Sequence, residues 1–133
     1  MIYTVFSDGA SRGNPGIAGA GYIIYDADGS VVAEKAIPLG VTTNNIAEYT
    51  AIIHAAKAVA ALNPKMVHFK LDSELIVKQV KGEYKVKDEK LKILYMELKS
   101  VLSNISYDIL HIPREQNKTA DKLSNLGADM NSN

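Results

Sequence analysis

Four acidic residues that lie far apart in the sequence stand at the ends of segments with strand-like or helical hydrophobic patterns. Asp8 and Asp72 each close a strand-like run. Glu48 lies in the first turn of a long helical pattern, and Asp121 lies early in the last one. Because α/β sheets bind ligands at such element ends, these four carboxylates are candidates for one shared acidic site.

Each of these acids also has a purely structural explanation. Asp8 could initiate the glycine- and proline-containing turn that follows it. Glu48 comes three residues after Asn45, the spacing of a capping box with Asn45 as N-cap. Asp72 could cap the next helix, and Asp121 could complement a helix dipole. The residues that flank the acids must therefore decide between the two interpretations.

Hydrophobic periodicity predicts the elements that must position the acids. The first strands form a meander, and the later strands cross over through helices, which is typical of an α/β domain. Strands are predicted over 1–8, over 19–39 as a hairpin that turns at Asp28-Gly29, over 65–72 and over 106–113, and helices over about 45–62, 73–81, 88–103 and 117–128.

Composition predicts a single domain over 1–133, with about 129–133 as a frayed tail. The absence of cysteine excludes disulfide and thiolate chemistry, and no signal peptide or membrane-spanning run is recognisable, so a cytoplasmic location is expected. No obligate protein partner is apparent. Fifteen basic residues balance fifteen acidic ones, so any contact with a polyanion must be local.

The segments around the four acids resemble the signature segments of type 1 ribonuclease H. They read SDGASRGNPGIAGAG, TTNNIAEYTAI, LDSELIVKQVKGEYKV and IPREQNKTADKLSN, in the family's order and spacing, and together they span almost the whole chain. The resemblance implies a ribonuclease H-like α/β fold. Its five-stranded mixed sheet would combine a three-strand antiparallel meander with two parallel strands, and helices would cover both faces.

The resemblance also implies an endonuclease that hydrolyses the RNA strand of RNA/DNA hybrids and leaves 5′-phosphate and 3′-hydroxyl ends. Asp8, Glu48, Asp72 and Asp121 match the family's four metal-binding catalytic carboxylates. Two hard divalent ions suit such a reaction and prefer oxygen ligands, so we expect two Mg²⁺ ions, with Mn²⁺ as a substitute. The alternatives are a nuclease for double-stranded RNA and a non-catalytic nucleic-acid binding module.

Substrate contacts are expected from backbone groups, amides and cations. RNA is distinguished from DNA by its 2′-hydroxyl groups, which polar side chains can contact in the shallow minor groove. Glycines near Asn14 would let the backbone approach, and arginine suits phosphate, although an exposed salt bridge would equally explain the two arginines. The expected substrate-binding residues are Gly9, Arg12, Asn14, Thr43, Asn44, Asn45, Lys85, Lys87 and Arg114.

Three departures from the family pattern concern substrate binding and proton transfer. Asp88 stands where the family usually has an asparagine beside a DNA phosphate, and no histidine aligns with the auxiliary histidine before the last acid. His111 is interpreted as a structural or surface residue. The connection KGEYKVKDEK is too short for the basic protrusion of larger members, although residues 78–92 hold six lysines and three acids. A solvated helix face is the alternative explanation for these lysines.

Overall fold

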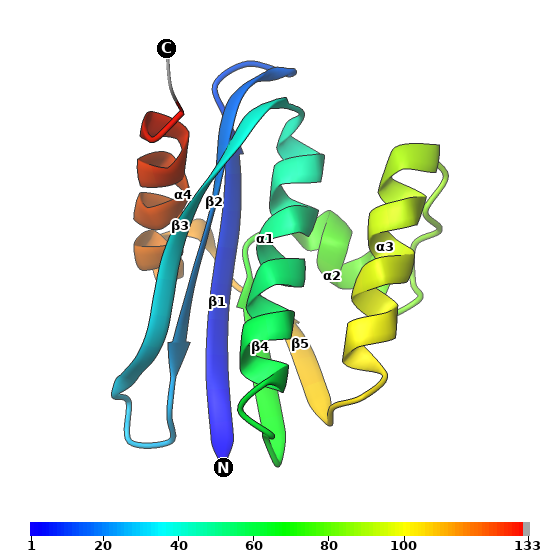
Figure 1. Cartoon of the computed structure of the whole chain (residues 1–133). Coiled ribbons are helices and arrows are strands. Elements are labelled where there is room, and N and C mark those ends of the chain that lie inside the picture. Colours follow the sequence, from blue (N-terminus) through cyan, green and yellow to red (C-terminus); the bar gives the residue numbers. More distant parts are fainter. Residues whose placement is uncertain (132–133) are drawn as a thin grey trace.

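The computed structural model describes residues 1–131, which form a five-stranded mixed sheet with helices on both faces (Figure 1). The strand order is β3-β2-β1-β4-β5. β1, β2 and β3 pair in antiparallel fashion, whereas β4 runs parallel to β1, and β5 runs parallel to β4. The predicted fold class is confirmed. The strands are β1 (Ile2–Ser11), β2 (Gly16–Tyr25), β3 (Val31–Thr42), β4 (Met66–Leu71) and β5 (Tyr107–His111).

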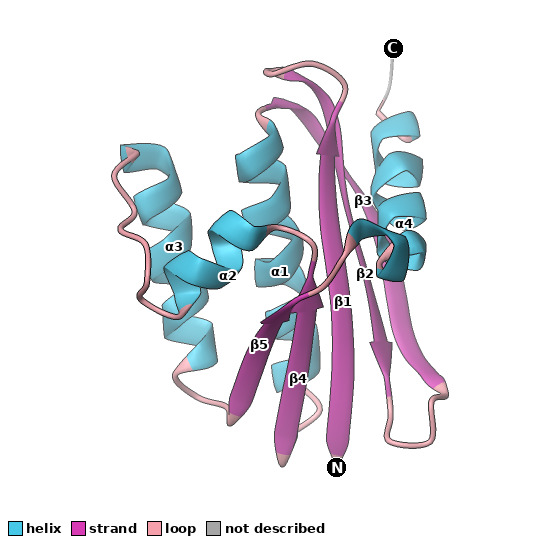
Figure 2. Ribbon diagram, turned by 180° about the vertical axis from the view of Figure 1, so that it is seen from behind, coloured by secondary structure: helices cyan, strands magenta, loops and turns pink. Residues whose placement is uncertain are grey.

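The helices cover the two faces of the sheet unequally. α1, α2 and α3 lie on one side, and α4 lies alone on the other, against β2 and β3 (Figures 1 and 2). Among residues 1–131, no helix has both the length and the apolar character needed to span a membrane. The helices are α1 (Asn44–Ala60), α2 (Glu74–Val80), α3 (Glu89–Leu102) and α4 (Lys118–Asp129), with a short 3₁₀ helix η1 (Arg114–Gln116) before α4.

The core lies between the sheet and α1. β1 and β4 alternate buried and more exposed residues, so Val5 and Phe69 point to the same face and are fully buried. α1 buries Tyr49 and Ile52 against them, at the helical spacing that the sequence predicts. Burying one such large side chain contributes about 1.5–3 kcal/mol. This core fixes α1 against β1, where two of the four acids reside.

The structure corrects the predicted end of β1 and the suggested cap of α1. β1 continues past Asp8 to Ser11, with Asp8 paired to Gly21 of β2, so the prediction that Asp8 closes the strand is wrong, and so is the alternative that Asp8 initiates the turn. The N-cap of α1 is Thr43, whose side chain accepts the Ile46 N–H at 3.3 Å, and the capping-box role of Asn45 is therefore wrong.

A serine hydroxyl also replaces a predicted acidic cap. Ser73, rather than Asp72, caps α2, because its side chain accepts the Ile76 N–H at 3.3 Å. The Asp72 carboxylate is consequently not needed for capping. Of the tail predicted at about 129–133, Asp129 ends α4 and the Asn131 side chain donates to the Ala18 carbonyl at 2.9 Å, whereas residues 132 and 133 lie outside the described part of the chain.

Candidate active site

Three carboxylates from separate elements meet beside the end of β4. Asp8 lies in β1, Glu48 near the start of α1, and Asp72 directly after β4. β1 and β4 are parallel neighbours, and their last paired residues are Phe6 and Lys70. Asp8 and Asp72 each lie two positions after these residues, so both acids reach the same level of the sheet. Oxygen atoms of Asp8, Glu48 and Asp72 lie within 4.8 Å of one another.

Close packing of α1 on β1 brings Glu48 to Asp8. A Cβ atom on Gly9 would overlap the backbone of Ala47 and Glu48, so a larger residue would push the helix away from the strand. The Gly9 N–H also donates to Asp8 Oδ1 at 3.0 Å. Gly9 therefore sets both the distance between the two acids and the orientation of one of them.

The fourth predicted acid reaches the same place from the other face of the sheet. Asp121 lies in the first turn of α4 and lines a cavity of about 360 Å³ together with the other three acids. Arg114 Nη2 lies 3.8 Å from Asp121 Oδ1. The cavity is lined by Asp8, Gly9, Ala10, Ser11, Arg12, Asn44, Glu48, Asp72, Arg114, Asp121 and Asn125. The structure thus gathers all four predicted carboxylates around one opening.

Burial and mutual repulsion make these acids hard to ionise. Burial, together with the charges of Asp72, Glu48 and Asp121, raises the pKa of Asp8 to about 8. Burial and the charge of Asp72 likewise raise the pKa of Glu48 to about 7, although Ser73 opposes the shift. The pKa of Asp72 is raised mainly by burial. A nearby cation would relieve this repulsion.

The donor set fits a hard divalent cation. Carboxylate oxygens converge, three of the acids hold raised pKa values, and the ligand group contains neither sulfur nor imidazole. A cation bound there would favour the ionised carboxylates, which burial otherwise penalises.

Two of the three asparagines predicted to bind substrate, Asn14 and Asn45, line a neighbouring cavity, whereas Asn44 lines the acidic one. Asn14 Oδ1 accepts the Asn44 N–H at 3.1 Å, which joins the β1–β2 turn to the start of α1. A cavity of about 600 Å³ contains Asn14, Thr43 and Asn45 in its wall, together with the N-terminal residues of α3. Asp88 also lines it, as the resemblance implies, and its carboxylate accepts the Leu91 N–H at 3.0 Å as N-cap of α3.

The predicted cationic contacts are exposed. Arg12 Nη1 lies 2.7 Å from Asp129 Oδ1, and both side chains are about half exposed or more, so this ion pair contributes little to stability. The Arg114 side chain is 81% exposed. Lys85 and Lys87 lie in the exposed segment between α2 and α3 and form no ion pair within residues 1–131. Their substrate roles stay predictions.

Two asparagines near the acids were missed by sequence reasoning. Asn125 Nδ2 donates to the Asp121 carbonyl at 3.0 Å and to its carboxylate at 3.3 Å. Its four-residue spacing from Asp121 on a predicted helix could have identified it. Asn117 is 1% exposed and donates to the Ser7 carbonyl at 3.0 Å across 110 residues, a contact that no local pattern predicts.

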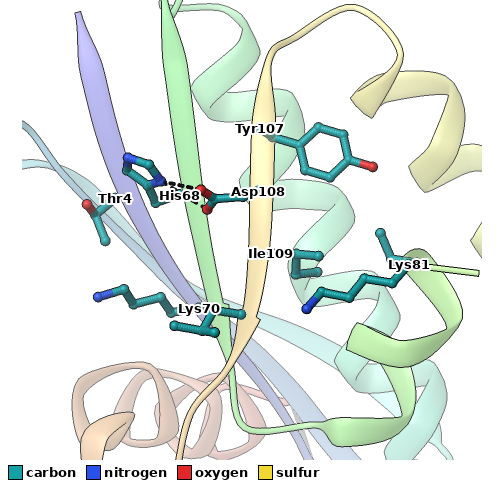
Figure 3. A pocket seen from close by; sticks show the side chains of 9 residues that line it. Thr4, His68, Lys70, Lys81, Tyr107, Asp108 and Ile109 are labelled. Atoms are coloured by element: carbon teal, nitrogen blue, oxygen red, sulfur yellow. Dashed lines mark hydrogen bonds and ion pairs between the residues drawn. The ribbon is translucent and has the colours of Figure 1, made fainter. Parts of the chain in front are cut away.

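A larger cavity, of about 670 Å³, lies away from the acids beside β5 (Figure 3). His68 Nδ1 lies 2.9 Å from Asp108 there, while Lys70 and Lys81 reach into it from β4 and from the residue after α2. It contains one carboxylate, already paired, so it lacks the converging acids of the first cavity. His111 Nδ1 lies 3.9 Å from Glu74 on the surface.

A mixed sheet of this strand order, with carboxylates from β1, α1, the end of β4 and α4 around one opening, defines a ribonuclease H-like protein. A family described as "Reverse transcriptase-like" matches residues 6–127. The chain belongs to this family and, with its relatives named below, to the type 1 ribonucleases H. The resemblance seen in the sequence is therefore confirmed.

Named relatives and solved structures agree with this assignment. Ribonuclease HI of Halobacterium salinarum is 38% identical over 125 residues, which cover 93% of this chain and 63% of that protein. The bifunctional protein Rv2228c of Mycobacterium tuberculosis is 38% identical over 133 residues, which cover 97% of this chain and 36% of that protein. This chain thus spans less than two thirds of either relative.

Structural similarity extends over nearly the whole chain. The crystal structure of RNase H1 from Halobacterium salinarum has a TM-score of 0.93 and 36% identity, covering 97% of this chain and 98% of that one. The structure of LC11-RNase H1 in complex with an RNA/DNA hybrid has a TM-score of 0.91 and 38% identity, and the match covers 96% of each chain.

The raised pKa of Asp8 predicts that the metal-free protein loses stability as pH rises. Between about pH 4 and pH 8 the folded state retains a proton on Asp8 that the unfolded state releases. The free energy of unfolding should therefore fall with pH, by up to about 1.4 kcal/mol per pH unit from this group. Urea denaturation in a chelator at several pH values measures this slope.

Asp8→Asn should reduce the slope, because the asparagine carries no titrating proton. Asp28→Asn, at an exposed hairpin position, is the matched control and should leave the slope unchanged. Equal slopes for Asp8→Asn and the parent protein would contradict the repulsive acidic site.

Proposed function

We propose that this protein is a metal-dependent endonuclease that hydrolyses the RNA strand of RNA/DNA hybrids and leaves 5′-phosphate and 3′-hydroxyl ends. The observation that carries the proposal is the convergence of Asp8, Glu48 and Asp72 within 4.8 Å. It occurs in a chain that is 38% identical, over 96% of its length, to a ribonuclease H1 solved with an RNA/DNA hybrid.

Asp8, Glu48, Asp72 and Asp121 would hold two Mg²⁺ ions, or Mn²⁺ in their place, which supply a nucleophilic hydroxide and stabilise the leaving oxyanion. Asp8 is the central acid, because it is 7% exposed and its pKa responds to the charges of all three others. Holding the acids in place before substrate arrives avoids reorganisation during the reaction. Arg114, beside Asp121, would bring positive charge to the rim of the site, where a phosphate must enter.

Hybrid recognition would rest on the amides at the β1–β2 turn and at the start of α1. Asn14 and Asn44 are tied together by a hydrogen bond, so their remaining polar groups are presented from a fixed frame. Amides can donate to and accept from a 2′-hydroxyl, and this group tells RNA from DNA. The Thr43 hydroxyl and the cavity beside it would face a phosphate of the DNA strand.

The segment between α2 and α3 would extend contact along the duplex. Lys85 and Lys87 are exposed, and this segment leads into the N-terminal end of α3, which lines the same cavity as Asn14 and Asn45. Lys85 and Tyr84 also line a cavity of about 470 Å³. Lysines that neutralise backbone phosphates position a duplex without reading its sequence.

A cleavage assay tests the proposed activity. We expect the protein to cut the RNA strand of a labelled RNA/DNA hybrid only when Mg²⁺ is added, and to leave a DNA duplex intact. Asp8→Asn should slow hydrolysis by more than about 100-fold, since even residues that only support metal ligands cost 10–100-fold. Hydrolysis in chelator, or full activity of Asp8→Asn, would contradict the metal site. Faster cleavage of an RNA duplex would assign the enzyme to that substrate.

Asp88→Asn should improve hybrid binding. The substitution removes a negative charge from the cavity that contains Thr43, and asparagine is an equally good N-cap, so α3 should stay intact. Relief of one repulsive contact of about 1 kcal/mol would lower the KM for hybrid about fivefold and leave kcat unchanged. Glu83→Gln, which makes the same charge change outside this cavity, is the control. An unchanged KM in Asp88→Asn would show that no phosphate lies there.

Replacing Lys85 and Lys87 together by glutamine should weaken binding and its salt dependence. Each lost phosphate contact reduces the slope of log affinity against log salt by about 0.7–0.9, so the slope of the double variant should be smaller by about 1.4–1.8. KM should rise while kcat changes little. The double variant Lys35→Gln/Lys65→Gln carries the same charge loss outside this segment. Equal salt slopes for both double variants would indicate that the lysines are only a solvated surface.

A further inference from the structure

Asn117 is a buried amide at the junction of the elements that carry the acids. It lies between η1 and α4, is 1% exposed, and is one of the largest fully buried side chains of the protein. A polar side chain at such a position is unfavourable unless its hydrogen bonds compensate for the loss of water. The contacts of Asn117 therefore indicate what its amide does.

The hydrogen bonds of Asn117 join two acid-bearing elements. Its Nδ2 donates to the Ser7 carbonyl at 3.0 Å, one residue before Asp8 in β1. Its backbone carbonyl accepts the Asp121 N–H at 3.0 Å in the first turn of α4. Asp8 and Asp121 approach the cavity from different elements, so this one residue couples their backbones.

The buried amide of Asn117 also carries an energetic cost. Within residues 1–131, Asn117 Oδ1 itself has no hydrogen-bond partner although it is buried. If this position only had to fill space at the start of α4, an apolar side chain would do so without burying an unpaired oxygen.

We propose that Asn117 is a positioning residue, which holds Asp8 and Asp121 in the arrangement that lets them bind divalent cations together with Glu48 and Asp72. It acts through the Ser7 carbonyl, which directly precedes Asp8, and through the first turn of α4, which carries Asp121. The inference rests on the proposed function for its effect on hydrolysis, but its effect on cation binding is independent of any nucleic acid.

Two variants separate positioning from simple structural support. Asn117→Ala removes the amide, and Asn117→Leu removes it while keeping a branched side chain of similar shape, so that no cavity forms. Ser124→Ala is the matched control, because Ser124 is equally buried in α4 but its hydroxyl donates only to the backbone carbonyl of Asp121, at 2.7 Å. Circular dichroism measures the melting temperature of each variant, so that cation binding can be compared at a temperature at which all of them are folded.

Calorimetric titration with Mn²⁺, without nucleic acid, is the deciding measurement. We expect both Asn117 variants to raise the Kd for Mn²⁺ at least about tenfold, the range for residues that orient metal ligands, and Ser124→Ala to stay within about twofold of the parent protein. In the hybrid cleavage assay, kcat should fall and KM should stay nearly constant, because Asn117 lines neither the acidic cavity nor the cavity that contains Asn14 and Asn45.

Unchanged Mn²⁺ affinity in a folded Asn117→Leu protein would overturn the positioning role, even if its melting temperature fell. Failure of the parent protein to cut the hybrid, together with weakened Mn²⁺ binding in the Asn117 variants, would overturn the proposed function but support the positioning role.

Discussion

Repulsion among the clustered carboxylates, of which Asp8 is buried and the others are partly buried, is the constraint that the rest of the structure must oppose. Asp8, Glu48 and Asp72 would separate if they were attached to mobile loops, because ionised acids at these distances repel one another. Each is instead tied to a rigid element whose position is fixed by other contacts. The hydrophobic core between α1 and the sheet provides the opposing free energy, so the site stores electrostatic strain that a bound cation would relieve.

The topology explains why the acids converge from distant parts of the chain. Parallel neighbours β1 and β4 bring Asp8 and Asp72 to the same level, whereas α1 and α4 approach from opposite faces with Glu48 and Asp121 (Figure 2). The close approach depends on residues without side-chain bulk, above all Gly9 against the backbone of α1. The small residue at position 9 thus sets the distance between β1 and α1, and with it the distance between Asp8 and Glu48.

Sequence reasoning predicted the element order and the gathering of four acids, because hydrophobic periodicity and separated motifs carry that information. It misplaced the end of β1 at Asp8, since backbone pairing with β2 continues through the glycines that locally suggest a turn. It also considered Asn45 and Asp72 as helix caps, but the caps are Thr43 and Ser73, which lie one or two residues away and have equally suitable side chains. The position of Asn117 could not be predicted, because its side chain contacts a residue 110 positions away in the sequence and no local pattern indicates such a contact.

A hydrogen-bond chain connects α1, the helix that carries Glu48, to the basic surface segment. The Tyr49 hydroxyl of α1 donates to Gln79 Oε1, and Gln79 Nε2 donates to the Lys85 carbonyl at 3.4 Å. Tyr49 and Gln79 are both buried, so the backbone at Lys85 is held relative to α1 although its side chain is exposed. In a protein of zero net charge, long-range attraction of a polyanion is weak, and fixed local cations matter more. Anchoring the lysine segment to the helix that carries Glu48 would therefore align a bound duplex with the acids.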